Sequence, residues 1–272
     1  MCTLTFAWHV FGEAPLVVAA NRDELLDRES RPPERIHDGR AIVAPVDEQA
    51  GGTWIGYNDA GLFAGITNRW TADDREGERS RGLLMRDVLG QETAQAATRL
   101  VERELDERVY EGFNLVVADG MAAVADPGSY LDPPTPQERE DPVAAMLIEH
   151  DGGVHTSILE PGVHVVVNVG ADGNYAVPEA RPEAGRAQAE NADRLRTHLT
   201  PEPGETATGW RDRAKAAIRD HEFGVCVHHE ERGFGTRSSS VLTFGDGGVR
   251  YEYADGPPCT TDYEDVAATV GE

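Results

Sequence analysis

Cys2 is the residue in this sequence that most clearly suggests catalytic chemistry. It follows the initiator methionine in a chain of 272 residues with only three cysteines. If Met1 is removed, Cys2 carries a thiol and a free α-amine on one residue. The α-amine has a pKa of about 7.7–8.0, so it can accept the thiol proton near neutral pH and leave a nucleophilic thiolate. A buried strand residue without a catalytic role is the structural alternative.

The tetrapeptide Asn-Arg-Asp-Glu at residues 21–24 follows an apolar run at residues 16–20, where a buried strand is predicted to end. If this strand lies beside the strand that starts at Cys2, its polar end lies beside the thiol. Arg22 could hold a carboxylate or stabilise an oxyanion, and Asp23 could hydrogen-bond the α-ammonium or a substrate amide. A turn or helix cap with a surface salt bridge is the alternative.

Other predicted strand ends offer further polar groups. Asn68 and Asn168 could each donate an amide N–H to an oxyanion, although asparagines at strand ends are also common structural residues. A glycine pair precedes Trp54 and permits either close approach of a ligand or a bulge. A glycine-containing turn precedes Arg237 and could place this guanidinium in a site or simply form a hairpin.

Metal and cofactor signals are weak in this sequence. His228 and His229 are adjacent, so on a strand they point to opposite faces and do not bind one metal together. The cysteines lack a CxxC spacing, which predicts neither a disulfide framework nor a zinc site. HExxH, GxSxG and phosphate-binding glycine motifs are also absent from the sequence. We therefore expect no metal and no cofactor.

The chain is strongly acidic, with 49 acidic and 25 basic residues, a net charge of −24 and a pI near 4.7. Of the basic residues, 24 are arginines and only Lys215 is a lysine. The acidic residues are spread along the chain, which favours adaptation to a salt-rich cytoplasm, as in a halophilic archaeon, over a single interaction tail. A metal-binding or cation-attracting acidic face is the alternative.

The same composition excludes several classes of protein. Nucleic-acid binding requires clustered basic residues, and the apolar runs are too short to span a bilayer. The first residues lack the basic and apolar regions of a signal peptide. We expect a reduced cytoplasmic protein that acts on a small-molecule or lipid-like partner. Its oligomeric state does not follow from the sequence.

Strand and helix signals alternate in blocks, β-α-β-α-β, with hairpin-like turns inside the strand blocks. Strands are predicted at Thr3–Val10, Leu16–Asn21, Ala41–Val46, Thr53–Tyr57, Leu62–Thr67, Phe113–Ala118, Met121–Ala125, Ala145–Glu149, Val154–Leu159, Val163–Val169, Val225–His229, Ser238–Phe244 and Val249–Tyr253. Helices are predicted from Ser80 to Leu89, Glu92–Leu105, Pro182–Leu199 and Gly209–His221, and surface loops at Arg31–Arg35, Asp132–Pro142 and Thr200–Thr206.

Hairpins imply antiparallel sheets, and helices between the strand blocks can cover the sheet faces. This predicts an α+β fold, a four-layer αββα sandwich of two stacked antiparallel sheets. We expect one domain over residues 1–256 and an acidic, loosely held tail over residues 257–272.

Six motifs occur in one order along the chain: Met1-Cys2-Thr3, Ala19–Glu24, Gly51–Gly56, Thr67-Asn68, Gly112–Leu115 and Gly235–Arg237. This set resembles the NRDE family, also called the Transport and Golgi organisation protein 2 family, over about residues 1–245. The resemblance implies an N-terminal-nucleophile (Ntn) hydrolase fold with Cys2 as nucleophile. By similarity to the bile-salt-hydrolase and penicillin-V-acylase branch, it also implies catalytic roles for Arg22, Asp23, Asn68, Asn168 and Arg237.

Two functions follow as hypotheses. The first is an amidohydrolase that cleaves a non-peptide C–N bond of a small or lipid-like acyl amide, with Asn21, Glu24 and Trp54 in contact with the substrate. The second is a non-catalytic carrier that uses the same cleft for an acyl lipid or for haem, with Cys2 on the iron and His9 or His164 assisting. Eukaryotic members of the family are associated with Golgi organisation, lipid metabolism and haem movement. A degenerate hydrolase with a structural role is a third possibility.

Overall fold

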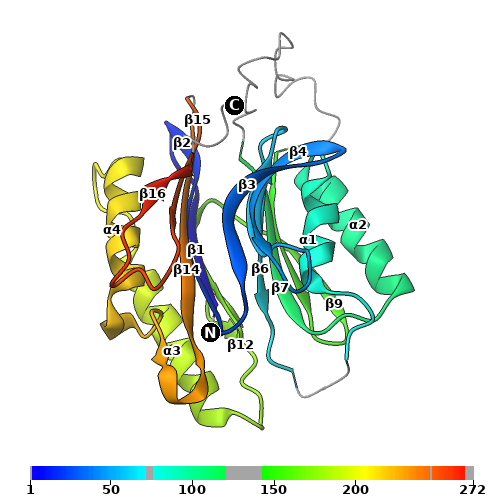
Figure 1. Ribbon diagram of the computed structural model, residues 1–272. Helices are drawn as coiled ribbons and strands as arrows, with labels where there is room; N and C mark the ends of the chain where they lie inside the picture. The colour runs from blue at the N-terminus through cyan, green and yellow to red at the C-terminus, as the bar shows by residue number, and fades with distance from the viewer. Residues whose placement is uncertain (1, 72–75, 121–142, 246, 267–272) are drawn as a thin grey trace.

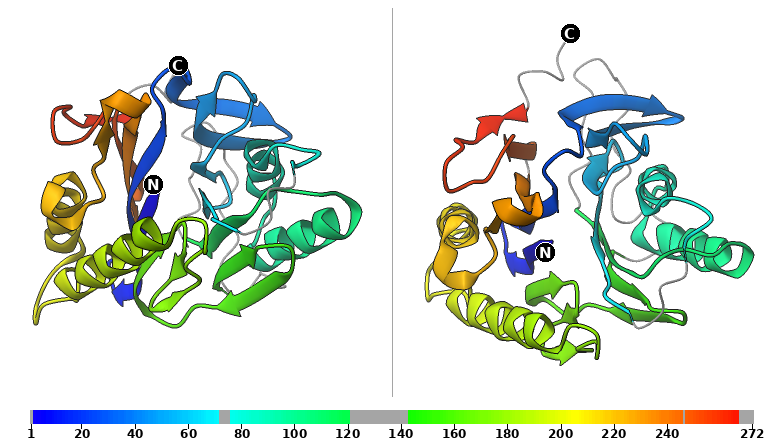
Figure 2. Two further views of the ribbon diagram at one scale, coloured as in Figure 1. Left: turned by 90° about the horizontal axis from the view of Figure 1, so that it is seen from below. Right: turned by 60° about the horizontal axis from the view of Figure 1, so that its bottom comes forward.

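The computed structural model describes residues 2–71, 76–120, 143–245 and 247–266 of the chain. Two antiparallel sheets of nine and seven strands lie face to face, and each carries a pair of helices on its outer side (Figure 1). The predicted four-layer αββα sandwich is therefore confirmed. Figure 2 shows the molecule from below, with β1, in blue, in the nine-stranded sheet and the other sheet facing it.

The nine-stranded sheet has β1, β2 and β14 at its centre. Its order is β12 (Asn174–Tyr175), β11 (Gly170–Ala171), β10 (Gly162–Val167), β1 (Thr3–Phe11), β2 (Ala14–Leu25), β14 (Phe234–Gly245), β15 (Gly248–Ala254) and β16 (Glu264–Asp265), and β13 (His228–His229) pairs with β14. Helices α3 (Pro182–His198) and α4 (Ala207–Arg219) cover its outer face, and the short 3₁₀ helices η1 (His221–Phe223) and η2 (Glu230–Arg232) flank β13.

The seven-stranded sheet follows the order of the chain. Its strands are β3 (Ser30–Asp38), β4 (Arg40–Asp47), β5 (Ile55–Asn58), β6 (Leu62–Asn68), β7 (Phe113–Asp119), β8 (Ala145–His150) and β9 (Val154–Ile158). Helices α1 (Arg81–Leu89) and α2 (Ala94–Glu107) cover its outer face. The Ser80 hydroxyl caps α1 by accepting from the backbone N–H of Gly82, as the sequence predicted.

Three apolar layers hold the four structural layers together. Phe6 and Phe63 belong to the core between the sheets, where the Phe63 ring meets Phe244 edge to face at 6.1 Å. Ala7, the next residue on β1, belongs to the core between its sheet and the helices, together with the buried Trp210 of α4. The central strands are buried on both faces, which explains why their sequences are almost continuously apolar.

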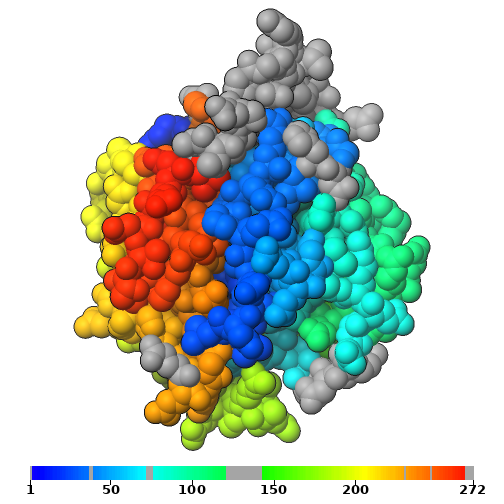
Figure 3. Space-filling view, in the orientation of Figure 1, coloured from blue at the N-terminus to red at the C-terminus, as the bar shows by residue number. Residues whose placement is uncertain are grey.

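The structure corrects two predictions about the first strands. The segment Arg31–Arg35 was predicted as a loop, but it lies in edge strand β3, which forms part of the blue stripe down the centre of Figure 3. A bulge between Arg31 and Glu34 leaves the intervening prolines outside the regular pairing, which is how an edge strand accommodates them. The second strand was predicted to end at Asn21, but residues 22–24 also lie within β2, because β14 pairs with β2 as far as Leu25.

Two smaller differences concern other segments. Of the strand predicted at Val225–His229, only His228–His229 pairs with a neighbour. Residues 257–266, expected to be loosely held, include β16, which pairs with β15, and Tyr263, whose hydroxyl hydrogen-bonds Ser239. The predicted strand Met121–Ala125 and the predicted loop Asp132–Pro142 lie outside the described residues.

Candidate active site

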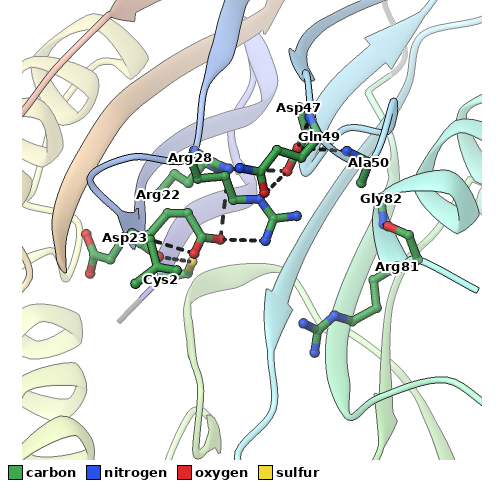
Figure 4. Close-up of polar contacts among 12 residues, drawn as sticks. Cys2, Arg22, Asp23, Arg28, Asp47, Gln49, Ala50, Arg81 and Gly82 are labelled. Carbon is green, nitrogen blue, oxygen red and sulfur yellow. Dashed lines mark hydrogen bonds and ion pairs between the residues drawn. The ribbon is translucent and has the colours of Figure 1, made fainter. Parts of the chain in front are cut away.

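Strand register brings Cys2 to the polar segment of β2. Thr3, the first residue of β1, pairs with Asn21 of β2. Cys2, one residue before β1, therefore lies beside Arg22. The partly buried Cys2 thiol lies 3.6 Å from the backbone carbonyl oxygen of Asp23, to which it donates a hydrogen bond (Figure 4). The predicted juxtaposition of the thiol with residues 21–24 is present in the structure.

Asp23 is a buried carboxylate that is held by a hydrogen bond from the neighbouring strand β14. Thr236, its pairing partner on β14, donates a hydrogen bond from Oγ1 to Asp23 Oδ1 at 2.5 Å. Burial raises the pKa of Asp23, and the positive charge of the amino terminus is the largest influence in the opposite direction. The carboxylate therefore sits where a cationic group at the start of the chain stabilises its charged form.

The Arg22 guanidinium is buried and stacked. It lies 4.1 Å from the centroid of the Trp54 ring, and its Nη2 is 3.4 Å from Asp47 Oδ2. Its Nη1 is buried and donates no hydrogen bond to the described residues. Burial lowers the pKa of this group, with Glu24 as the first opposing influence. A guanidinium with a buried free N–H is suited to bind a carboxylate or a developing oxyanion.

Asp47 organises the arginines of the site, and the sequence analysis did not identify it. Its Oδ2 accepts from Arg28 Nε at 2.8 Å as well as from Arg22, and its Oδ1 accepts from the backbone N–H groups of Gln49 and Ala50 (Figure 4). The sequence signal that could have revealed it is an aspartate directly after an apolar strand and before a glycine pair. Such an aspartate forms a turn with its own backbone.

Two large cavities meet at Cys2, which also lines a small third cavity of about 20 Å³. One has a volume of about 370 Å³ and is rich in charged groups. Its lining includes Cys2, Arg22, Glu24, Arg28, Asp47, Trp54, Asn68, Arg79, Arg81 and Glu111. The other has a volume of about 920 Å³ and a partly apolar wall. Its lining is Cys2, Asp23, Glu24, Asn68, Trp70, Asn168, Ala180, Arg181, Pro182, Glu183, Ala184, Ala187, His229, Arg232 and Phe234.

The two predicted oxyanion donors differ in their availability. The exposed side chain of Asn68 lines both cavities with Cys2, and its amide makes no hydrogen bond within the described part of the chain. Asn168 lines only the larger one, and its buried amide donates to the Asn68 carbonyl oxygen at 2.6 Å and accepts from Gln188. Asn68 is thus free to bind a substrate oxygen, and Asn168 holds the backbone of Asn68 in place.

The other predicted residues fall into two groups. Glu24 and Trp54 line cavities that contain Cys2. Asn21 lines only the small cavity of about 20 Å³ with Cys2, and its Nδ2 donates on the helix side of the sheet to the carbonyl oxygens of Ile218 and Val225 at 2.7 and 2.9 Å. Arg237 is the extra residue of a β-bulge in β14 and lines none of the described cavities that contain Cys2. The bulge separates Thr236 and Ser238, the partners of Asp23 and Arg22.

The histidines suggested for haem lie elsewhere. Both ring nitrogens of His164 are engaged, Nδ1 with Asp172 at 2.6 Å and Nε2 with the Glu160 carbonyl oxygen at 2.9 Å. Neither His164 nor His9 lines a described cavity that contains Cys2. These two side chains therefore do not support an iron site at Cys2.

The sequence model of one protein family, Transport and Golgi organisation 2, matches residues 1–254. The mouse Transport and Golgi organization 2 homolog is 27% identical over 148 residues, and the human homolog is 28% identical over 148 residues. Both alignments cover 53% of this chain and 51% of the relative. The chain thus spans about half the length of the curated relatives it matches.

Solved structures resemble the whole fold at low sequence identity. Penicillin V acylase from Agrobacterium tumefaciens has a TM-score of 0.55 at 13% identity, over 98% of this chain and 86% of that chain. The Caenorhabditis elegans ortholog of N-acylethanolamine-hydrolyzing acid amidase has a TM-score of 0.54 at 11% identity, over 91% and 98%. These are Ntn-hydrolase folds, so the predicted fold class is confirmed. Among the described residues, none of the helices combines the length and apolar character needed to cross a bilayer.

Proposed function

Because this chain belongs to the Transport and Golgi organisation 2 family and has an Ntn-hydrolase fold, we propose that it hydrolyses the C–N bond of a small-molecule acyl amide. Cys2 is the nucleophile once Met1 has been removed. The observation that carries this proposal is the place of the Cys2 thiol, which lies at the junction of two cavities and beside Asp23, Arg22 and Asn68.

The proposed reaction proceeds through a thioester. The α-amine of Cys2 takes the thiol proton, and the thiolate attacks the amide carbon to form a C–S bond. The oxyanion that forms accepts a hydrogen bond from the Asn68 amide, and the α-ammonium, held beside Asp23, protonates the nitrogen as the C–N bond breaks. The α-amine then deprotonates a water molecule, which attacks the thioester, releases the acid and restores the thiol.

The lining of the cavities supports a substrate of mixed polarity. Trp70, Phe234 and several alanine and proline side chains in the larger cavity suit an apolar acyl chain. The smaller cavity is lined by the guanidinium groups of Arg22, Arg28 and Arg81, which suit an anionic group on the amine portion in exchange for their present pairing with Glu24 and Glu111. We therefore infer an N-acyl amine with a carboxylate or similar anion as the preferred substrate class.

The test combines intact mass with hydrolysis of two matched substrates. Purified protein should lack Met1 and should cleave N-dodecanoyl-glycine faster than N-dodecanoyl-ethanolamine. Arg22→Lys should reduce this preference by roughly tenfold or more, because lysine does not reproduce the stacked planar guanidinium. Cys2→Ala should abolish hydrolysis, while Arg40→Lys, a surface variant of the same chemistry, should retain it. Retention of Met1, or equal hydrolysis by Cys2→Ala, would rule out the mechanism.

An acyl-lipid carrier is the second candidate, and the 920 Å³ volume of the partly apolar cavity is the observation that favours it. Carrier function predicts stoichiometric binding of a fluorescent fatty acid by wild type and by Cys2→Ala, without hydrolysis of any acyl amide tested. Hydrolysis by wild type that requires Cys2 would contradict it.

A further inference from the structure

Four potential metal ligands from two stretches of the chain converge at one place outside the cavities described above. They are His221 in η1, Cys226 in the following connection, His228 in β13 and Cys259 in the turn after β15. One ligand atom from each, two imidazole nitrogens and two sulfurs, lie within 4.8 Å of one another. The sequence analysis predicted no metal site, because the spacing of these residues matches no short motif.

Two distances within this group, the His/Cys cluster, are close to those of a tetrahedral site, and all pairs lie within 4.8 Å. His228 Nε2 lies 3.6 Å from Cys226 Sγ and 3.2 Å from Cys259 Sγ, and the His221 and His228 rings meet edge to face with centroids 5.1 Å apart. With Zn–S bonds of about 2.3 Å and Zn–N bonds of about 2.0–2.1 Å, ligand atoms on a tetrahedron are separated by about 3.3–3.8 Å. The His/Cys cluster thus needs little rearrangement to enclose a zinc ion.

We propose that His221, Cys226, His228 and Cys259 bind one Zn²⁺ ion in a structural Cys₂His₂ site. Two thiolates and two neutral imidazoles are ligands that favour zinc over the hard cations bound by carboxylates. Both cysteines lose a proton on binding, so the two thiolates balance the charge of the ion. Four protein ligands leave no open position for a water molecule or substrate, which assigns the ion a structural role.

The fold presents the ligands from separate, anchored segments. Gly224 ends η1 with a φ of 63°, the left-handed conformation that turns the chain toward Cys226. Cys259 lies in a turn in which the backbone N–H groups of Thr260 and Thr261 both donate to the Pro257 carbonyl oxygen. A zinc ion would therefore connect the η1–β13 connection to the C-terminal segment, which lie 31 residues apart at His228 and Cys259.

The same connection is tied to the candidate active site. Asn21 Nδ2 donates to the Val225 carbonyl oxygen, just before Cys226, and the backbone N–H of Val227, just after it, donates to Thr236 Oγ1 at 2.8 Å. Thr236 Oγ1 in turn donates to Asp23. A bound ion would thus fix the segment that orients Thr236 and, through it, the Asp23 carboxylate. Asn21 thus anchors the segment that carries Cys226 to strand β2.

Cobalt(II) is the first probe, because tetrahedral thiolate ligation of Co²⁺ produces visible d–d and near-ultraviolet charge-transfer absorption. Reduced, metal-free wild type should develop this spectrum with one equivalent of Co²⁺ and lose it on addition of one equivalent of Zn²⁺. Cys2→Ala should keep the spectrum, which excludes the proposed nucleophile as a ligand. Cys259→Ser should lose the charge-transfer band, and His229→Ala, the adjacent exposed histidine, should keep it.

Zinc content of protein purified with reductant and without chelator is the second measurement. One zinc per wild-type chain and a loss of most of it in Cys259→Ser would support the site. A spectrum of octahedral Co²⁺, zinc content unaffected by Cys259→Ser, or a Cys226–Cys259 disulfide in protein kept under reductant would overturn it. The spectrum of wild type and Cys2→Ala decides the question even if Cys259→Ser does not fold.

Discussion

The Asp23 carboxylate is the residue at which stability and function conflict most directly. It is buried beside a thiol in a sheet, a position in which an apolar or neutral side chain would fold more readily. The sequence revealed this residue through its neighbours in residues 21–24. It did not reveal Asp47 or the role of Asn21, because those depend on which backbone groups and guanidinium groups arrive from distant strands and helices.

Replacing Asp23 by asparagine should raise stability while it abolishes hydrolysis. Burial raises the pKa of Asp23, so the folded protein holds the proton more tightly than the unfolded chain does. The stability that this gives is fully present at a pH below the ordinary pKa of aspartate. It is lost as the pH rises from that ordinary pKa through the raised pKa of the folded protein. Asp23→Asn removes that loss. Urea unfolding should show the variant to be more stable than wild type at pH 8, with the difference shrinking toward pH 4. A variant that is less stable at pH 8 would contradict this expectation.

At the scale of elements, pairing with distant strands overrides the local sequence signal. Residues 21–24 are polar and suggest the end of a strand, yet β14 supplies hydrogen-bond partners over 200 residues later and extends β2 to Leu25. The charged, proline-containing segment β3 forms a strand because its backbone pairs with β4 at the edge of the sheet. The helices were predicted more accurately, since capping residues such as Ser80 act within one turn of the chain.

The contact between the Gly52 backbone and helix α1 should be sensitive to a single methyl group. A Cβ atom at Gly52 would lie 2.2 Å from the Gly82 carbonyl carbon in the first turn of α1, where Thr53 N–H also donates to Gly82 O. Gly52→Ala should therefore lower the free energy of unfolding by about 1–3 kcal/mol and displace α1 from the smaller cavity. Gly12→Ala, where a Cβ meets nothing within 4 Å, is the matched control for urea unfolding. Equal effects of both variants would refute the steric explanation.

The hairpin of β10 and β11 should lose stability as pH rises. Burial lowers the pKa of His164, but the hydrogen bond and charge of Asp172 outweigh it and raise the pKa overall. The stabilisation is therefore present below the ordinary pKa of 6.5 and is lost as pH rises through the folded value. Asp172 has a φ of 52°, which asparagine also tolerates, and Asp172→Asn keeps an acceptor for Val165 N–H.

Unfolding of wild type and Asp172→Asn at two pH values measures this effect. At about pH 6 the wild type should be more stable by about 1.5–3 kcal/mol, the usual contribution of a hydrogen bond to a charged group. At about pH 9, where the imidazole is neutral in both proteins, most of this difference should disappear. A difference that is constant with pH would show that the His164–Asp172 contact does not depend on the imidazolium.

At the scale of the whole molecule, the net charge of −24 should make stability depend on salt. The Debye length shortens from about 8 Å at 0.15 M salt to about 3 Å at 1 M salt. Screening is therefore stronger at high salt, which suppresses repulsion among the acidic residues. The melting temperature should rise steadily in KCl up to about 2 M, because repulsion over the whole surface exceeds the exposed ion pairs, each worth about 0–1 kcal/mol. Replacing exposed Glu102, Glu107 and Asp212 by their amides should weaken this rise. A melting temperature that falls with salt would indicate that ion pairs dominate.

The layers and the position of Cys2 beside residues 21–24 were predictable because they depend on patterns along the chain: apolar blocks, hairpins, and a cysteine at a special position. The His/Cys cluster was not, since Cys259 reaches it from the segment expected to be a tail. Arg237 was predicted for the site from the resemblance, but a bulge in β14 gives it a place outside the cavities with Cys2. Irregular pairing of this kind leaves no clear mark in a single sequence.

The hydrogen bond between Thr236 and Asp23 joins residues 213 positions apart, and this has a consequence for protein synthesis. On the ribosome, β1 and β2 emerge long before β14, the strand that pairs with β2 in the same sheet. Asp23 therefore meets Thr236 only after β14 has emerged, and a chain that stops before β14 lacks this contact beside the Cys2 thiol. The Thr236–Asp23 contact thus reports that translation has passed β14, and β2 has an open strand edge until then.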